Sequence, residues 1–208
     1  MAAATRAPQR PSTQGITVWL TGLPSAGKTT VANLVGDRLA ALGRPAEVLD
    51  GDVVRTHLSR GLGFSRADRD ENIRRIGYVA GLLTGHGVTV LVSAISPYRA
   101  VREEVRAAIG RVGGFVEVHV ATDLATCRAR DVKGLYAKQA RGELQGLTGV
   151  DDPYEPPLAP ELVLDTAGEP PDASAARVLS LLDRRAAPVG GRAAPSTTDG
   201  WAPDREGS

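Results

Sequence analysis

The chain has 208 residues, a length that accommodates one domain with a full hydrophobic core, because domains cluster at roughly 100 to 150 residues. It carries 25 lysine and arginine residues against 24 acidic ones, for a formal net charge of +1, so charge alone selects neither nucleic acid nor an anionic membrane as a partner. The single cysteine, Cys127, excludes an internal disulfide and favours a reducing, cytoplasmic location.

Two terminal segments differ in composition from the rest of the chain. Residues 1–14 and 186–208 are rich in Ala, Pro, Gly, Arg, Ser and Thr without apolar periodicity, which predicts flexible tails. The start of the chain lacks the apolar stretch of a signal peptide, and no later run approaches the roughly 20 apolar residues of a membrane span. We therefore expect one domain over residues 15–185 and no membrane partner.

Short apolar runs alternate with helical patterns along this domain. Five runs have the length of buried strands: 16–21, 46–50, 88–94, 115–121 and 161–165. Helical spacing of apolar residues occurs near 28–42, 68–86, 98–111, 123–129 and 173–185. The alternation predicts an α/β fold of three layers, in which helices cover both faces of a five-stranded parallel sheet.

Residues 130–158 break the alternation. They are charged, contain glycine and end in proline, with no obvious strand and too many polar groups for a core helix. A segment of this kind next to a binding site is typical of a mobile lid.

The residues between the first strand and the first helix match the nucleotide-binding pattern G-x-x-x-x-G-K-[S/T]: Gly22, Leu23, Pro24, Ser25, Ala26, Gly27, Lys28 and Thr29. In such a loop the backbone N–H groups and the helix N-terminus face the phosphates. Lys28 adds a positive charge near the β- and γ-phosphates, Thr29 offers a hydroxyl to Mg²⁺, and Thr30 offers a second one. A chance glycine-rich turn is disfavoured by the position between strand and helix. The loop predicts nucleotide binding without distinguishing a motor, a switch GTPase and a kinase.

Polar residues also follow the second and third strands, at the sheet edge where open α/β sheets bind ligands. Of Asp50 and Asp52, one could hold Mg²⁺ and the other could accept the proton of an acceptor hydroxyl, or either could cap the next helix. Ser96 could contact substrate, carry phosphate covalently, or cap a helix, because Ser before Pro is common at helix starts.

A cluster of guanidinium groups with one aromatic ring comes next: Arg55, Phe64, Arg66, Arg69, Asn72, Arg74 and Arg75. Guanidinium forks match phosphate and sulfate oxygens, and aromatic rings stack on bases, so the cluster could clamp an anionic nucleotide. Charges on a helix face are usually solvated, and we interpret Arg66, Arg74 and Arg75 as surface residues. The three histidines have no Cys or His at metal-ligand spacing, which argues against a transition-metal site.

Segments spread over about residues 15–185 resemble the adenylylsulfate kinase family, in the family's order: GLPSAGKTT, LDGD, LGFSRADRDENIRRIG, ISPYRAVR, RDVKGLYAKQARGE, LTGVDDPYEPP and ELVLDT. The resemblance implies that ATP phosphorylates the 3′-hydroxyl of adenylyl sulfate (APS), giving 3′-phosphoadenylyl sulfate (PAPS) and ADP in sulfate activation. It also implies the strand order 2-3-1-4-5 of nucleotide kinases and a homodimer, and it leaves a sulfurylase as a candidate partner.

The resemblance further implies roles for individual residues. ATP would be bound by Gly22 to Thr29, Thr30 and Arg130, with Mg²⁺ on Thr29 and Asp50. The catalytic set would be Lys28, Asp50, Asp52 and Ser96. The APS site would comprise Asp52, Arg55, Phe64, Arg69, Asn72, Ile95, Ser96, Lys133, Gly134 and Leu135, with Phe64 stacked on the adenine. The chain departs from the family at Val53, Val132, Ala137 and Gln139, which puts substrate affinity and lid dynamics in question.

Two other interpretations remain open. A kinase of similar fold could act on another small hydroxylated metabolite, such as gluconate, shikimate or a nucleoside monophosphate, although Phe64 and Asn72 favour a nucleotide. A regulatory subunit, docked to a sulfurylase, could bind ATP without transferring phosphate. The presence of Lys28, Thr29, Asp50 and Asp52 argues against it.

Overall fold

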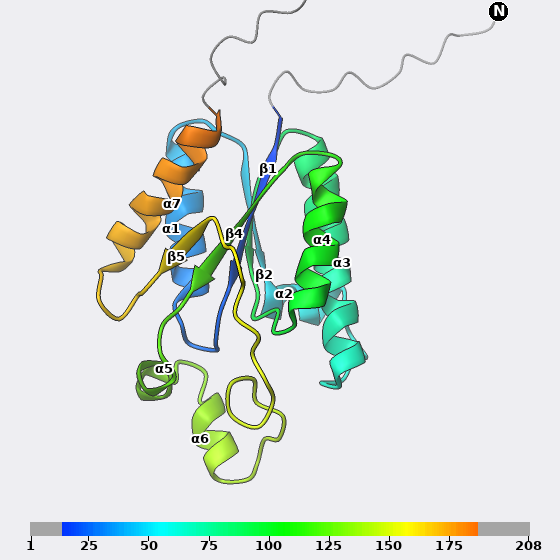
Figure 1. The fold of residues 1–208 in the computed structure, drawn as a ribbon, viewed down its shortest axis with the longest axis vertical. Helices are drawn as coiled ribbons and strands as arrows, with labels where there is room; N and C mark the ends of the chain where they lie inside the picture. The colour runs from blue at the N-terminus through cyan, green and yellow to red at the C-terminus, as the bar shows by residue number, and fades with distance from the viewer. Residues whose placement is uncertain (1–13, 187–208) are drawn as a thin grey trace, which may run out of the picture.

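The computed structural model describes residues 14–186. The predicted tails, apart from residues 14 and 186, lie outside the described residues. A parallel sheet forms the centre of the described chain, in the order β2-β3-β1-β4-β5 (Figure 1). Its strands are β1 (Ile16–Thr21), β2 (Ala46–Asp50), β3 (Thr89–Ser93), β4 (Gly114–Val120) and β5 (Leu162–Leu164). Both the five strands and their order confirm the sequence predictions.

Helices cover both faces of the sheet. They are α1 (Lys28–Ala41), α2 (Gly51–His57), α3 (Arg66–Gly85), α4 (Arg99–Gly110), α5 (Leu124–Arg130), α6 (Leu135–Ala140) and α7 (Pro171–Ala186). Figure 1 shows α1 and α7 together on one face, and α3 and α4 on the other. Within residues 14–186, none of the helices has the length and apolar character needed to cross a membrane.

The central strand β1 contributes to a separate hydrophobic core on each face. Val18 and Leu20 are buried against α1 and α7, whereas Trp19 is buried with the apolar residues of α3 and α4. This follows from the alternation of side chains along a strand, and both faces are apolar because helices cover both. The α3–α4 contact is close at Gly77, where a Cβ atom would lie 2.7 Å from Cγ2 of Val105.

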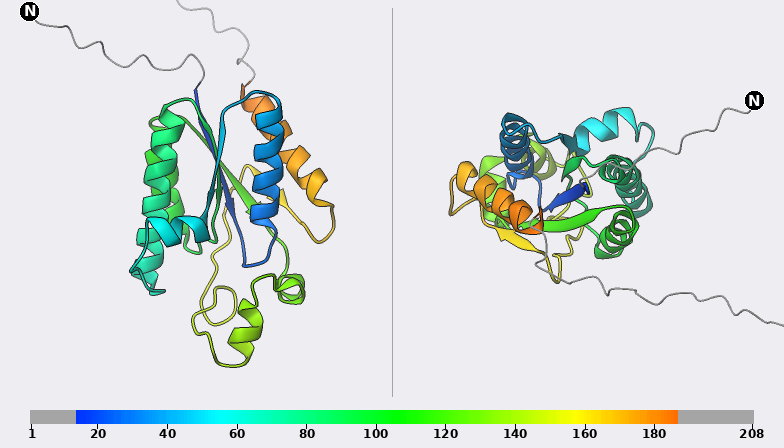
Figure 2. Two further views of the ribbon diagram at one scale, coloured as in Figure 1. Left: turned by 180° about the vertical axis from the view of Figure 1, so that it is seen from behind. Right: turned by 90° about the horizontal axis from the view of Figure 1, so that it is seen from above.

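The 130–158 segment lies beyond the carboxyl ends of the strands (Figures 1 and 2). The sequence predicted no strand and no core helix in this segment, and it did not indicate the short helix α6 that forms there. The carboxylate of Asp131 accepts the N–H groups of Tyr136 and Ala137, at 3.0 and 2.9 Å, which satisfies donors of the first turn of α6. Tyr136 is buried in the same core cluster as α1 and Leu135 packs against that cluster, so two neighbouring side chains anchor this short polar helix.

Candidate active site

The phosphate loop between β1 and α1 requires glycine at two positions. A Cβ atom on Gly22 would lie 2.4 Å from the carbonyl oxygen of Val120 at the end of β4. Gly27, at the start of α1, has φ 96°, a left-handed conformation that glycine adopts without a steric penalty. Ser25 shares the left-handed region with φ 61°. These conformations turn the loop over the N-terminus of α1, whose N–H groups favour an anion.

Lys28 lies almost entirely below the surface, with 8% of it exposed. Its Nζ donates hydrogen bonds to the carbonyl oxygens of Gly22, at 3.0 Å, and Leu23, at 2.7 Å. Burial lowers the pKa of Lys28 from 10.5 to about 8. The amine is therefore held inside the loop by the loop's own carbonyl groups, and its charge is sensitive to pH near neutrality.

Oxygen atoms from three elements meet beside Lys28. The Thr29 hydroxyl donates to Oδ2 of Asp50 at 2.7 Å and lies 2.9 Å from the Ser93 hydroxyl. Oδ1 of Asp50 accepts the N–H of Asp52 at 2.9 Å, which makes Asp50 the N-cap of α2. Both roles considered for Asp50 are thus compatible with its position, whereas the capping alternative for Asp52 is wrong. Ser93, at the end of β3, was not predicted as a site residue.

This oxygen cluster suits a hard cation. Mg²⁺ is commonly held by one or two protein oxygens together with substrate phosphates, so a full protein cage is not required. Accordingly, the part of the chain that the structure describes contains no group of three or more His, Cys, Asp or Glu residues arranged to hold a metal. The donor set of Thr29 and Asp50 fits Mg²⁺ bound with a nucleotide.

The acceptor side of the site begins with Asp52, whose side chain is 67% exposed. Its Oδ2 forms an ion pair with Nζ of Lys133, which comes from the 130–158 segment. Cζ of the Arg55 guanidinium lies over the Phe64 ring, 4.3 Å from the ring centroid. Phe64 itself is 63% exposed. Oδ1 of Asn72 is buried and has no hydrogen-bond partner within residues 14–186. The exposed Phe64 side chain and Oδ1 of Asn72 are therefore available to a ligand.

Arg69 joins the acceptor side to the 130–158 segment. Its Nη1 donates to the hydroxyl of Thr148 at 2.7 Å, and its Nη2 donates to the carbonyl of Gly146. The other arginines of the cluster, Arg66, Arg74 and Arg75, have side chains 61%, 45% and 39% exposed, as surface residues would.

Ser96 does not cap a helix. The residue before α4 is Tyr98, which makes no side-chain cap, and the N–H of Arg99 in the first turn donates to the Glu155 carboxylate and not to Ser96. The Ser96 hydroxyl instead accepts a hydrogen bond from Nε1 of Trp19 at 2.9 Å and donates to the carbonyl of Ala94 at 3.2 Å. Ser96 is 1% exposed and has φ 43°, an uncommon conformation for a residue with a side chain. The capping interpretation is therefore wrong, because the turn directs this hydroxyl into the core.

A second layer of threonines supports the phosphate loop and was not predicted. The carbonyl oxygen of Ala26 accepts hydrogen bonds from Thr122, at 3.1 Å, and Thr166, at 2.8 Å. Arg130 donates to Thr166 through both terminal nitrogens, at 2.7 Å to the hydroxyl and 2.6 Å to the carbonyl. Thr166 ends the ELVLDT segment that follows the family pattern, but nothing in that segment indicated a contact with the phosphate loop.

One cavity of about 490 Å³ joins these parts. Most predicted site residues line it: Pro24, Ser25, Gly27, Lys28, Thr29, Thr30, Asp50, Asp52, Arg55, Phe64, Arg69, Asn72, Ile95, Ser96, Arg130, Lys133 and Leu135. Four predicted residues are not in its lining: Gly22, Leu23, Ala26 and Gly134. Lining residues that were not predicted are Val31, Gly51, Ile73, Ser93, Ala94, Pro97, Val132, Thr166 and Pro171.

Comparison with known proteins identifies the family. The family model of adenylylsulphate kinase matches residues 14–165. The chain belongs to the adenylylsulphate kinase family. It is 58% identical over 171 residues to the adenylyl-sulfate kinase of Gloeothece citriformis, covering 82% of this chain and 96% of that relative.

Solved structures of the family have the same fold. The APS kinase of Mycobacterium tuberculosis, in complex with AMPPNP and APS, has a TM-score of 0.78 and 46% identity, covering 82% of this chain and 99% of that chain. The hexameric APS kinase from Thiobacillus denitrificans has a TM-score of 0.66 and 42% identity, covering 84% of this chain and 30% of that chain.

Proposed function

We propose that this protein is an ATP-dependent adenylyl-sulfate kinase, which transfers the γ-phosphoryl group of ATP to the 3′-hydroxyl of APS and releases PAPS and ADP. The observation that carries the proposal is the single cavity that joins the phosphate loop to the acceptor side with Phe64 and Asn72. The lining of this cavity includes both a phosphate cradle and an aromatic ring, which suits a nucleoside triphosphate facing a second nucleotide. Family membership supports the same reaction.

On the ATP side, the N–H groups of the loop and the start of α1 would bind the phosphates, and Lys28 would place its ammonium against the β- and γ-oxygens. Thr29 and Asp50 would hold Mg²⁺, and this ion would supply positive charge to the phosphate oxygens during transfer. Arg130 would lie near the nucleotide base or phosphates, fixed by its two bonds to Thr166.

On the acceptor side, the 3′-hydroxyl oxygen of APS forms a bond to the γ-phosphorus as the bond from that phosphorus to the leaving ADP oxygen breaks. Asp52 is the proposed acceptor of the hydroxyl proton, because its carboxylate is exposed in the cavity and not used for capping. Arg55 and Arg69 would match the anionic groups of APS, the free Oδ1 of Asn72 would accept a donor from it, and Phe64 would stack on the adenine.

Ser96 is proposed to position the substrate, and not to carry phosphate. Ser96 is 1% exposed, and its hydroxyl donates its proton to the carbonyl of Ala94, so it has neither open access to phosphorus nor a general base as its partner. Direct transfer between the two substrates needs only positioning and charge stabilisation.

We also propose that the 130–158 segment acts as a lid. It contacts the phosphate loop through the Tyr136 hydroxyl, which donates to the carbonyl of Pro24 at 3.1 Å. It contacts the acceptor side through the pair of Lys133 with Asp52. A segment that contacts both substrate sites can change its position when either substrate binds. Its closure would exclude water, which could otherwise accept the phosphoryl group.

A coupled assay of ADP formation with Mg-ATP tests the reaction. We expect turnover with APS that exceeds turnover with gluconate, shikimate or AMP, and its loss in Lys28→Ala. Turnover with another acceptor, and not with APS, would support a kinase activity but would show that APS is not the substrate. Binding of ATP without turnover on any acceptor would instead support the regulatory interpretation.

The assembly and location are proposals as well. A homodimer is proposed for this chain, and the hexameric relative supports self-association of some order. Light scattering on the purified chain, alone and with a sulfurylase, would measure both self-association and that partner. The single cysteine, which is free and buried, is compatible with the proposed cytoplasmic location.

A further inference from the structure

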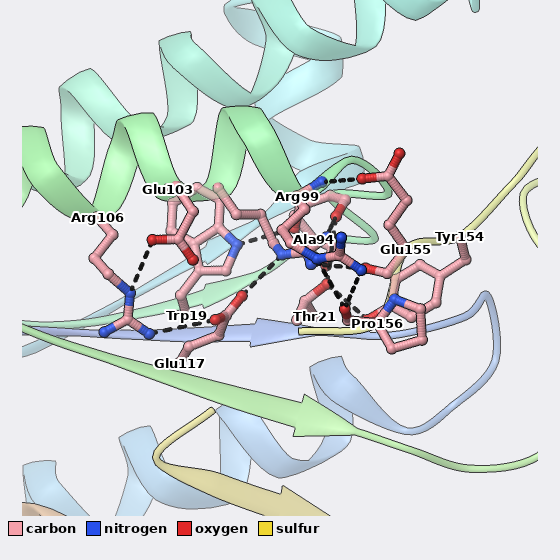
Figure 3. Close-up of polar contacts among 12 residues, drawn as sticks. Trp19, Thr21, Ala94, Arg99, Glu103, Arg106, Glu117, Tyr154, Glu155 and Pro156 are labelled. Carbon is pink, nitrogen blue, oxygen red and sulfur yellow. Dashed lines mark hydrogen bonds and ion pairs between the residues drawn. The ribbon is translucent and has the colours of Figure 1, made fainter. Parts of the chain in front are cut away.

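A buried arginine behind the cavity has no part in the reaction described above. Arg102 on α4 is 2% exposed, and its partner Glu117 on β4 is 3% exposed. Nε of Arg102 donates to Oε1 of Glu117 at 2.8 Å. Its other two nitrogens donate to backbone carbonyls, Nη1 to Ser96 at 2.6 Å and Nη2 to Glu155 at 2.7 Å. Figure 3 shows two of these partners, Glu117 on the sheet and Glu155 near the end of the 130–158 segment. One guanidinium thus joins three separate segments.

Neutralising Glu117 does not account for Arg102. The second oxygen of Glu117 already faces Arg106, whose Nη2 lies 3.3 Å away (Figure 3). Burying a charged pair carries a large desolvation penalty, and an apolar pair of similar volume is often as stable. An apolar pair could not reproduce the two hydrogen bonds from Arg102 to the carbonyl oxygens of Ser96 and Glu155. The role of Arg102 is therefore sought in these two hydrogen bonds.

The first carbonyl belongs to a turn that forms the wall of the cavity. Ser96 has φ 43°, which is unfavourable for a residue with a Cβ atom, so the turn persists only if its surroundings hold it. Trp19 binds the Ser96 hydroxyl, and the Thr21 hydroxyl donates to the carbonyl of Ile95 at 2.7 Å. Arg102 adds the contact with the Ser96 carbonyl itself. Ile95 and Ser96 both line the cavity, so the turn sets the shape of its acceptor side.

The second carbonyl belongs to the end of the lid segment. The N–H of Glu155 donates to the carbonyl of Pro97 at 2.8 Å, and the Glu155 carboxylate accepts the N–H of Arg99 at 2.8 Å. The neighbouring Tyr154 places its hydroxyl 3.1 Å from that of Thr21. The end of the lid segment therefore packs directly on the Ser96 turn, and Arg102 donates a hydrogen bond to a carbonyl oxygen of each.

We propose that Arg102 is a positioning residue for the acceptor substrate, which locks the Ser96 turn to the end of the lid segment. It acts through backbone carbonyls and touches no substrate. The planar fork of arginine reaches three acceptors at fixed angles, which the single ammonium of lysine cannot do. The inference rests on the proposed function, since APS is taken as the molecule that fills this side of the cavity.

Steady-state kinetics of Arg102→Lys, with each substrate varied separately, tests the proposal. We expect the KM for APS to rise and kcat to fall, together reducing kcat/KM for APS by roughly 10- to 100-fold, as misplacement near 1 Å can do. The dissociation constant of AMPPNP should stay within about twofold, because the phosphate loop makes no contact with Arg102. Arg106→Lys is the matched control, since Arg106 shares the helix and the Glu117 partner but does not reach the turn.

A second variant separates positioning from charge balance. Arg102→Met/Glu117→Met removes both buried charges together, so the chain should stay folded even if Arg102→Lys does not. If Arg102 only balances Glu117, the double variant will have the wild-type KM for APS, and the proposal is wrong. We expect the defect in APS use to persist. Parallel losses in the affinities for AMPPNP and APS would also overturn the proposal, because they indicate a general loss of structure.

A readout that does not depend on turnover keeps this inference distinct from the proposed function. The indole N–H of Trp19 binds the Ser96 hydroxyl, so its ¹H–¹⁵N NMR signal reports the turn. The chain has two tryptophans, and Trp201→Phe assigns the signal. We expect Arg102→Lys to shift it more than Arg106→Lys does, because Arg106 reaches Trp19 only through the Phe115 ring. If wild type does not use APS, the proposed function fails alone. An unshifted signal would overturn the inference even in an active enzyme.

Discussion

Titration of Lys28 should control how ATP affinity depends on pH. Burial lowers the pKa of this amine from 10.5 to about 8, and only the ammonium form attracts phosphate. Bound ATP favours the ammonium, so the apparent Kd should rise as the free protein loses this proton. For a pKa of about 8, the Kd increases about twofold at pH 8 and about tenfold at pH 9, relative to pH 7.

Titration calorimetry with a non-hydrolysable ATP analogue, Mg²⁺ and constant ionic strength measures this dependence. The range should begin near pH 7, because the last ionisation of a phosphate lies at about 6. Lys28→Arg is the control, since its guanidinium stays charged to a pH above about 12 and its profile should be flat. A wild-type Kd at pH 9 within twofold of the value at pH 7 would refute the reasoning.

The same proton has the opposite effect on the stability of the free protein. The pKa of Lys28 is about 8 in the folded chain and 10.5 when the amine is exposed in the unfolded chain. Between these two pH values the unfolded chain therefore binds more protons than the folded chain. The free energy of unfolding contributed by Lys28 therefore rises with pH across that window. The Tm of wild type relative to Lys28→Met should increase from pH 8 to pH 10, and a decrease would contradict the assigned burial.

Three further substitutions test other contacts. Asp50→Asn should keep the wild-type Tm, because Asn caps helices well. It should raise the Mg²⁺ concentration that gives half-maximal rate by roughly 10- to 100-fold, and an unchanged Mg²⁺ requirement would contradict the role of Asp50. Tyr136→Phe removes the bond from the lid to the phosphate loop and should lower the free energy of unfolding by about 1 kcal/mol in a urea titration, where no change would mean that the bond does not form in solution. Gly77→Ala should cost about 1–3 kcal/mol, because its Cβ atom would meet Val105 at 2.7 Å. Gly81→Ala on the same helix has its nearest atom at 3.7 Å and should stabilise the chain; equal effects would contradict the packing described.

Local patterns explain why much of the fold and the phosphate loop could be predicted. Strands buried on both faces produce short apolar runs such as 88–94, and a loop that binds phosphate requires glycine and lysine at set spacings. Asp50 was identified because strand ends meet at one edge of a parallel sheet. These features depend on neighbours within a few residues, so they are visible in the order of amino acids.

Other features depend on residues that are distant along the chain. Thr166 supports the loop carbonyl of Ala26 across 140 positions, and no spacing rule joins them. Helix capping was one of the roles predicted for Ser96, but its hydroxyl accepts a hydrogen bond from the indole N–H of Trp19 on the central strand. α6 was missed because two neighbouring apolar residues, Leu135 and Tyr136, and an aspartate outside the helix hold it in place, and these do not form an apolar stripe with helical spacing.

The order of amino acids alone was therefore enough to establish an α/β nucleotide-binding fold, its strands and its resemblance to a kinase family, because periodicity and motif spacing are local properties. Folding was needed to show that the phosphate loop, the carboxylates and the arginine cluster share one cavity. Folding also brought Arg102 from α4, Glu117 from β4 and Glu155 from the end of the lid segment to a single point. Long-range contacts of this kind arise when separate elements pack, so no stretch of sequence encodes them by itself.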